Sequence, residues 1–381
     1  MLEISKDVLS DPLALFRQFE IIEDPRIDRH KRYPLMNILV FAFVAILSDQ
    51  QSWYQIFAFA KSNLDWFGQF IDVSSGVPSH DTFRRVLSLL NPSQLEAAVI
   101  CWTEELRLKN KMKNYRFIIL DGKALKGVPW KLNDQQLYVL NAWDADSNLF
   151  LGQLTIGEKT NEITAAPQLL EKLNLKDTVV SVDAIMTQKE IAEKIIDGGG
   201  NYVMALKGNQ GTLFEDVKLY FSEINEGMSC WQTLEKNRGR IESRTCTTSF
   251  DIEWLMQRQE WKGLKGIFKV DSETSYEGQT AQETRYFITS LETNAFSCLN
   301  FARKHWSIEN GLHRTLDINF REDSCQVHDR NAASNLSILR KLAISLLKAI
   351  DPDKRLIWKI KEAAYSAAFR TRCLLGGGGV S

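Results

Sequence analysis

The sequence predicts an α/β protein in which helices flank a mixed β-sheet, with an N-terminal all-helical domain and a β-rich insertion. Three observations support this fold class. Apolar residues recur at helical spacings over the first hundred residues, short apolar runs typical of strands begin after Lys113, and strand-like segments return at about 225–290. We expect an N-terminal helical domain at 1–98, a second domain at 99–350 that holds the mixed sheet and the insertion, and a basic helix with a flexible tail at 351–381.

Composition excludes several classes of protein. The 381 residues include 47 Lys and Arg and 48 Asp and Glu, so the formal charge of −1 excludes a protein that holds nucleic acid by bulk positive charge, although a local basic groove stays possible. Six scattered cysteines without paired spacing argue against a zinc site or a disulfide framework and fit a reducing cytoplasm. The N-terminus lacks the pattern of a signal peptide.

The N-terminal region is expected to consist of packed helices. Residues 36–47 are apolar throughout, but a membrane-spanning helix needs roughly 20 such residues, so a buried core helix is the better interpretation. A second helix is expected within 52–67. Ser79 is a predicted N-cap before an apolar stripe, and Pro92 begins a helix that runs towards Leu106.

From residue 116 the order of elements indicates the topology. Three strand-like runs come first, and then helices alternate with two further runs; the five runs are 116–120, 137–143, 149–156, 179–182 and 202–206. A meander followed by right-handed βαβ units is the order of the ribonuclease-H-like fold, in which the first and fourth strands are adjacent and parallel. Strand-like segments within the insertion lie at 243–250, 266–270 and 284–289, and helices resume at 301–350.

Two aspartates end the first and fourth of these runs. Asp121 alone suggests a turn, and Asp183 alone suggests a cap on the helix side. Because the two strands are expected to be neighbours, the two carboxylates would lie side by side and repel each other, and a hard divalent cation relieves such repulsion. The sequence therefore predicts a metal site at Asp121 and Asp183.

Glu309 is the predicted third carboxylate. Its helical face carries positions 306, 309, 313, 316 and 320, which places the glutamate in an apolar stripe between Trp306 and Leu316. A buried carboxylate needs a metal or a basic partner such as Arg303. The pair Glu322 and Asp323 is a rival for the third ligand, in a context that suggests a solvated turn.

Basic and polar groups near these acids are candidates for gripping DNA phosphates. For two of these segments a purely structural role is the alternative to DNA binding: a plain strand-to-helix turn at 207–211 and a solvated hairpin at 236–244. No P-loop, GxGxxG, GxSxG or HExxH pattern is present, and the five dispersed histidines argue against a histidine-rich metal site. The predicted DNA-binding residues are Lys123, Lys126, Lys207, Asn209, Gln210, Arg238, Arg240, Arg303, His305, Asn310 and His313.

Several segments together resemble the H-repeat-associated group of DDE insertion-sequence transposases, over about residues 10–350. The matching segments are Asp-Pro-Arg-Ile-Asp-Arg-His-Lys-Arg-Tyr-Pro-Leu at 24–35, Pro-Ser-His-Asp-Thr-Phe at 78–83, Leu-Asp-Gly-Lys-Ala-Leu-Lys-Gly at 120–127, Gly-Glu-Lys-Thr-Asn-Glu-Ile at 157–163, and those at 182–190, 205–210, 305–310 and 316–323. Ala302, His305 and Leu316 stand where the broader superfamily usually has Tyr, Arg and Lys.

The resemblance implies that Asp121, Asp183 and Glu309 form a catalytic triad that binds Mg²⁺, or Mn²⁺ in its place. It implies metal-dependent cleavage of DNA ends and strand transfer on double-stranded DNA, by a homodimer in the bacterial cytoplasm that is associated with the nucleoid when bound to DNA and not with a membrane. Two alternatives remain: a metal-dependent nuclease without strand transfer, and an inactive DNA-binding relic. Three clustered acids argue against the relic, while the neutral charge argues slightly for it.

Overall fold

The computed structural model describes residues 12–110, 116–128, 136–157, 161–223, 228–237 and 239–375. Arg238, a predicted DNA-binding residue, and residues 376–381 of the predicted tail, which include the glycines 376–379, lie outside this part. The chain forms two compact units, and each is described by itself. The helical unit comprises residues 1–113, 122–159 and 309–381, and the sheet unit comprises residues 114–121 and 160–308.

The N-terminal part of the helical unit is built from helices, as expected. Helix α2 is the predicted core helix, since all its residues except Met36 are buried. The Ser79 hydroxyl accepts a hydrogen bond from the Thr82 backbone N–H, so the predicted N-cap is confirmed. The helices are α1 (Pro12–Glu20), α2 (Leu35–Leu47), α3 (Trp53–Ser62), α4 (Leu64–Phe67), α5 (His80–Leu89) and α6 (Pro92–Asn110).

The rest of the helical unit surrounds a long buried helix, α12 (Arg330–Ala349). This helix packs against α2, α5, α6 and strand β3. Its Lys341 ammonium is buried and donates to the side-chain oxygens of Asn141 and Gln153 on the antiparallel hairpin β2–β3. The remaining elements are β2 (Tyr138–Asp144), β3 (Leu149–Ile156), a π-helical turn η4 (Glu309–His313), α11 (Arg314–Ile318), the single turn η5 (Glu322–Ser324), α13 (Leu356–Tyr365) and α14 (Ala367–Leu375).

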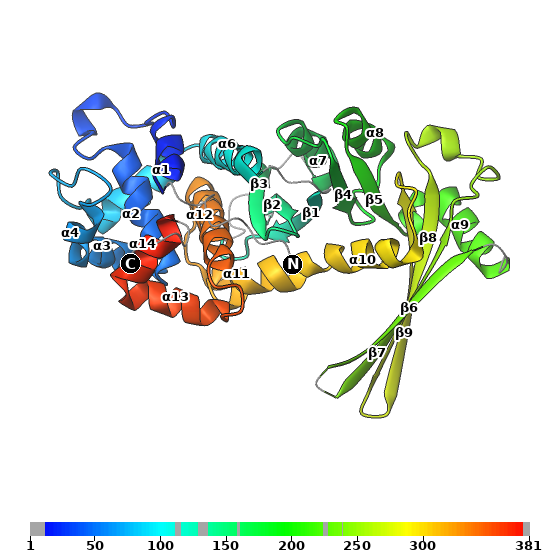
Figure 1. Ribbon diagram of the computed structural model, residues 1–381. Helices are drawn as coiled ribbons and strands as arrows, with labels where there is room; N and C mark the ends of the chain where they lie inside the picture. The colour runs from blue at the N-terminus through cyan, green and yellow to red at the C-terminus, as the bar shows by residue number, and fades with distance from the viewer. Residues whose placement is uncertain are drawn as a thin grey trace. The chain divides into compact units, whose positions relative to one another are not determined.

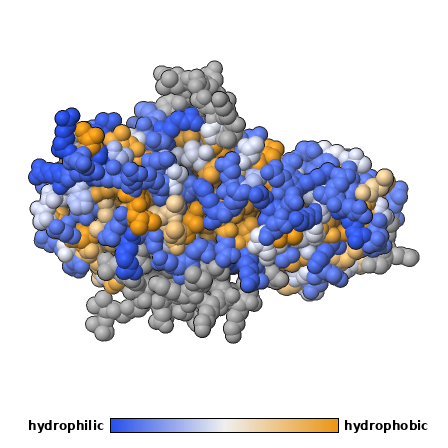
Figure 2. Space-filling view, turned by 90° about the horizontal axis from the view of Figure 1, so that it is seen from above, coloured by the Kyte–Doolittle hydropathy of each residue, from blue (hydrophilic) through white to orange (hydrophobic). Residues whose placement is uncertain are grey.

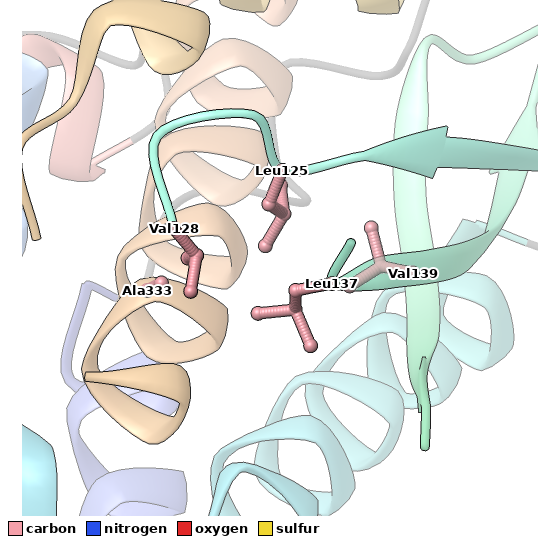
Figure 3. Packing of buried hydrophobic residues seen from close by; sticks show 5 residues of the cluster. All are labelled: Leu125, Val128, Leu137, Val139 and Ala333. Carbon is pink, nitrogen blue, oxygen red and sulfur yellow. The ribbon is translucent and has the colours of Figure 1, made fainter. Parts of the chain in front are cut away.

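A small apolar cluster fixes the loop that follows the first strand, β1 (Arg116–Ala124). Figure 3 shows Leu125 and Val128 of this loop beside Leu137 and Val139, with Ala333 of α12 closing the cluster. All of these residues belong to the helical unit. The loop that carries Lys126, directly after the strand residue Lys123, is therefore held by apolar packing.

The sheet unit contains a mixed β-sheet with strands in the order β1-β4-β5-β9-β8-β7-β6. The pairs β1–β4 and β4–β5 are parallel, and the remaining pairs are antiparallel. The strands after β1 are β4 (Thr178–Val182), β5 (Asn201–Leu206), β6 (Ser229–Asn237), β7 (Arg240–Ser249), β8 (Gly266–Tyr276) and β9 (Gln279–Thr289). The predicted fold class is confirmed: the sheet is mixed, its first and fourth strands are parallel neighbours, and the β-rich insertion is present as β6–β9.

Helices connect and cover this sheet. Helix α10 packs against β4, β6, β7 and β8, and α7 packs against α8. Figure 1 shows the hairpins β6–β7 and β8–β9 extending past α10 as a narrow twisted projection. The helices are α7 (Glu162–Glu171), α8 (Lys189–Asp197), α9 (Thr212–Glu223) and α10 (Ala295–His305), with single 3-10 turns at η2 (Gly208–Gln210) and η3 (Arg258–Glu260); a further such turn, η1 (Asp28–His30), belongs to the helical unit.

The surface in view is mainly hydrophilic. Figure 2 shows hydrophobic residues in smaller areas between the polar ones. Among the helices that the structure describes, none is both long enough and apolar enough to cross a membrane. All six cysteines lie in the described part and are free thiols, as their spacing predicts.

Candidate active site

Asp121 and Asp183 occupy neighbouring positions on two parallel strands. Strand pairing sets Leu120 opposite Val182, so the next residues are Asp121 on β1 and Asp183 directly after the end of β4. Both side chains are half-buried. The structure corrects one detail, because β1 continues through Asp121 to Ala124 instead of ending there. The register therefore places these two residues next to each other at the end of β4, and the metal site that they would form stays a prediction.

The Asp183 carboxyl lies in a partly desolvated environment. Burial raises its pKa above the ordinary value, while the backbone N–H groups of Met186 and Ile185 and the Lys207 ammonium act in the opposite direction. The N–H of Met186 lies 3.3 Å from Asp183 Oδ1, in the bend that precedes α8; the N-cap of that helix is Gln188, so Asp183 is not its cap. A raised pKa means that the anion is poorly stabilised by its surroundings, and a bound divalent cation would reverse this.

Glu162 is an acid that sequence reasoning missed. It begins α7, where the Asn161 side chain caps the helix, and it is half-buried. Burial raises the pKa of Glu162, and the negative charge of Asp183 raises it further. Glu162 therefore contributes to the negative potential around Asp183. The available signal was its place in the segment 157–163, which had been used only for the family resemblance.

Glu309 differs from its expected environment. It begins the π-helical turn η4 and is exposed, whereas the prediction placed it in an apolar stripe. The buried apolar positions of this segment are Ile308, Leu312, Leu316 and Phe320, so the predicted face is right at 316 and 320 and wrong at 309. A π-helical turn contains more residues than an α-helical one, so the periodicity used to assign the face does not hold across it. Such turns are frequent at functional sites.

The basic partners considered for the third acid are engaged elsewhere. Arg303 pairs with Glu235, at 2.7 Å between Nη1 and Oε1. Of the rival pair, Glu322 is buried with Oε1 3.7 Å from Arg340 Nη1, and Asp323 pairs with Lys126 at 2.7 Å. Both rivals therefore have structural roles in ion pairs within the helical unit.

Several predicted DNA-binding residues have structural partners. Lys123 is buried and donates to Asp317 at 2.7 Å. The side-chain amides of Asn209 and Gln210 both donate to the carbonyl of Ala184, at 2.7 and 2.6 Å, and so hold the residue that follows Asp183.

Other predicted residues are more accessible. Lys207 and Asn310 are exposed, and the exposed Arg240 guanidinium lies 5.2 Å from the centre of the Tyr276 ring. Arg303 lines a shallow pocket of about 400 Å³ on α10 together with Lys304 and Phe301.

The two histidines of the predicted site, His305 (buried) and His313 (half-buried), are neutral at pH 7. His305 Nδ1 lies 3.0 Å from the Ser181 hydroxyl, and burial, followed by the Arg285 charge, lowers the pKa of His305 to about 4. Burial also lowers the pKa of His313 to about 3, with contributions from Lys123 and Lys341. Neither imidazole carries a positive charge at neutral pH, so neither attracts phosphate as a cation.

The carboxylates are of the chemical type that binds a hard divalent cation. Asp121 and Asp183 supply oxygen ligands on neighbouring strands, which is what Mg²⁺ and Mn²⁺ prefer. Within the part of the chain that the structure describes, no group of three His, Cys, Asp or Glu side chains is arranged to hold a metal ion. The two aspartates therefore supply only part of a metal site, and a complete site needs a further ligand.

Paired carboxylates on the first and fourth strands of such a sheet define the class of ribonuclease-H-like enzymes that act on phosphodiesters. Residues 113–346 match the family model described as "Transposase DDE domain", and residues 16–103 match the model described as "DDE_Tnp_1-associated". The chain belongs to the DDE transposase family. The predicted resemblance to its H-repeat-associated group is confirmed by the relatives below.

Curated relatives cover most of the chain. It is 33% identical over 375 residues to the H repeat-associated putative transposase YhhI of Escherichia coli K12, covering 96% of this chain and 98% of the relative. It is 38% identical over 275 residues to an "uncharacterized protein in dhlA 3'region" of Xanthobacter autotrophicus, covering 71% and 92%. A solved piggyBac transposase synaptic complex with hairpin DNA aligns at 13% identity over 96% of this chain and 82% of that chain, with a TM-score of 0.43. The family assignment depends on the sequence matches.

Proposed function

We propose that this chain cuts the ends of a bacterial insertion sequence in a metal-dependent reaction and joins them to target DNA. The observation that carries the proposal is the register of Asp121 and Asp183 on parallel strands, in a chain of the DDE transposase family. Adjacent carboxylates on a rigid sheet are suited to phosphodiester chemistry, because positioning and charge neutralisation supply most of the catalysis.

The third member of the proposed triad is Glu309. Two features support it. The helix that precedes it ends at His305, which is bonded to Ser181, two residues before Asp183. Glu309 follows four residues later, at the start of a π-helical turn, and its exposure leaves the carboxylate accessible to a ligand.

In this proposal Asp121, Asp183 and Glu309 hold divalent cations, Mg²⁺ or Mn²⁺ in its place. When bound, such ions activate a water for in-line attack and stabilise the leaving 3′ oxygen. The sheet fixes the two aspartates so that they need little reorganisation. Glu162 adds negative potential beside Asp183, and the Lys207 ammonium partly offsets it. No side-chain nucleophile is required, since water and then a DNA 3′-hydroxyl attack the phosphorus.

We further propose that double-stranded DNA is gripped by the accessible basic and polar groups around these acids. Lys126, Lys207, Arg240, Arg303 and Asn310 have at least partly exposed side chains. Lys123, Asn209, Gln210, His305 and His313 would then act by holding the backbone near the acids. Transposition requires two ends held together, so the proposal includes a homodimer on DNA, working in the bacterial cytoplasm at the nucleoid.

The test is Mg²⁺-dependent nicking and joining of DNA that carries the ends flanking the gene. Wild type is compared with Asp121→Asn, Asp183→Asn and Glu309→Gln, each of which removes a charge with little change of shape. Glu215→Gln, at an exposed position on α9, is the matched control. Cutting and joining by wild type and by the control, lost in all three variants, is the expected result.

Two other results would contradict parts of the proposal. Cutting without joining would favour the nuclease. Binding of the ends without any cutting in Mg²⁺ or Mn²⁺ would favour the DNA-binding relic.

A further inference from the structure

The π-helical turn that begins at Glu309 is held from outside by a lysine of α12. Lys348 Nζ donates to the Gly311 carbonyl at 2.9 Å, two residues after Glu309. The Thr315 hydroxyl donates to the same carbonyl, also at 2.9 Å. The backbone of the turn is thus fixed by side chains as well as by its own hydrogen bonds.

The Lys348 ammonium contacts two hydrogen-bond acceptors and an aromatic ring. Besides Gly311 it donates to Asn148 Oδ1 at 3.1 Å, and it lies 5.2 Å from the centre of the buried Trp143 ring. Two acceptors and an aromatic face compensate the loss of water around the charge. Burial, followed by the Lys359 charge, lowers the pKa of Lys348 to about 8, so the ammonium form predominates at neutral pH.

The local sequence is suited to this contact at both ends. A Cβ at Gly311 would lie 3.4 Å from Lys348 Nζ, a tight contact that the glycine avoids. Asn148 adopts a left-handed conformation, with φ of 55°, in the turn between β2 and β3, and its side chain faces the lysine. The lysine therefore connects the tip of a rigid hairpin to the turn that begins at Glu309, entirely within the helical unit.

We propose that Lys348 is a positioning residue, which holds the π-helical turn in shape and so sets the orientation of the Glu309 carboxylate. The catalytic part of this inference rests on the proposed function, while the contact itself does not. Lys348 acts only through the backbone of Gly311 and touches none of the reacting groups. An exposed carboxylate on a loosely held turn would sample many orientations, and misplacement by about 1 Å is enough to slow an enzyme by about a hundredfold.

The test measures hydrogen exchange of the backbone amides at 309–316 in the full chain, and then DNA cleavage at varied Mg²⁺ concentration. Lys348→Met removes the charge. Asn148→Gly removes one of the two acceptors while keeping the left-handed backbone, and so provides a milder variant in which Lys348 keeps its contact with Gly311. Lys354→Met, at an exposed lysine paired with Glu362, is the matched control.

We expect exchange at 309–316 to become about tenfold faster in Lys348→Met and to change less in Asn148→Gly, with no change in the control. Cleavage by Lys348→Met should slow by at least about tenfold and need more Mg²⁺, with DNA affinity unchanged. Unchanged exchange at 309–316 would overturn the inference, and so would faster exchange with normal cleavage and normal Mg²⁺ dependence. If wild type cuts no DNA, the proposed function fails, and the exchange data still decide whether Lys348 holds the turn.

Discussion

The Ser181 hydroxyl on β4 and the Nδ1 atom of His305 at the end of α10 lie 3.0 Å apart, although 124 residues separate them in the sequence. Both groups are buried. The bond ties the helix that leads to Glu309 to the strand that leads to Asp183. The bond therefore links the two segments that carry these proposed catalytic acids, although neither acid takes part in it.

Replacing Ser181 with Ala should destabilise the protein by about 1–3 kcal/mol, because a buried imidazole nitrogen loses its partner. Urea unfolding measures the change. DNA cleavage should fall at the same time, since the end of α10 loses its anchor. Ser275→Ala, at an exposed hydroxyl that contacts Thr280, is the control and should leave both properties unchanged. Full stability in Ser181→Ala would show that the bond contributes nothing.

The buried histidines should make the protein less stable in mild acid. The pKa of His305 is lowered to about 4 from an ordinary value of 6.5, so the unfolded chain binds a proton in this interval that the folded chain does not. The free energy of unfolding should therefore fall as the pH falls from 6.5 towards 4, by up to about 3 kcal/mol from this residue. His313, with its pKa lowered to about 3, acts in the same direction.

Urea midpoints at pH 7, 6 and 5 measure this dependence. His305→Asn should show a shallower decline, whereas His328→Asn, at an exposed histidine, should follow wild type. A decline that is equally steep in His305→Asn would contradict the assignment to this residue.

Asp183→Asn should stabilise the metal-free protein and abolish its response to metal. The pKa of Asp183 is raised by burial, so its charged form costs free energy that a neutral amide does not. In EDTA the melting temperature should rise relative to wild type. With Mg²⁺ at about ten times its dissociation constant, wild type should gain about 1.4 kcal/mol, and the variant should gain little.

Thermal melting with and without metal checks both parts of this prediction. Glu215→Gln is the control and should respond to metal as wild type does. A variant that keeps the metal response would remove Asp183 from the proposed metal site.

Gly127→Ala should unfold the loop that follows β1 and carries Lys126. A Cβ at this position would lie 2.0 Å from the carbonyl oxygen of Cys325, which belongs to the backbone and cannot rotate away. We expect a loss of about 3 kcal/mol in unfolding free energy. Gly208→Ala is the matched control, since no described atom lies within 4 Å of a Cβ there. Equal stability of the two variants would contradict the prediction.

Much of the fold was accessible from the sequence because burial on a parallel sheet leaves a simple pattern. The apolar runs before Asp121 and Asp183 predicted two adjacent strands, and the register of Leu120 with Val182 confirms that they pair. The environment of Glu309 was predicted wrongly, since its face was assigned from a constant helical period that a π-helical turn interrupts. The interruption is a local change of backbone geometry, which the spacing of apolar residues does not record.

Side-chain partners far apart in the sequence were inaccessible for a different reason. Lys123 was interpreted as a DNA contact, but its ammonium is bonded to Asp317, 194 residues away. Glu162 was missed because helix α7 and strand β4 separate it in the sequence from Asp183, the acid whose charge it feels in the fold. Composition and spacing describe what a residue can do, whereas pairing depends on which segments the fold brings together.

Neither unit of the protein is a continuous stretch of chain, and this bears on how its gene can decay. The helical unit takes three segments and the sheet unit two, so the chain passes from one unit to the other four times. A premature stop codon in the middle of the gene removes α12, and the helices α2, α5 and α6 lose the apolar surface on which they pack. A shortened copy would therefore yield an unfolded product, with no surviving domain left to occupy DNA or to interfere with intact copies.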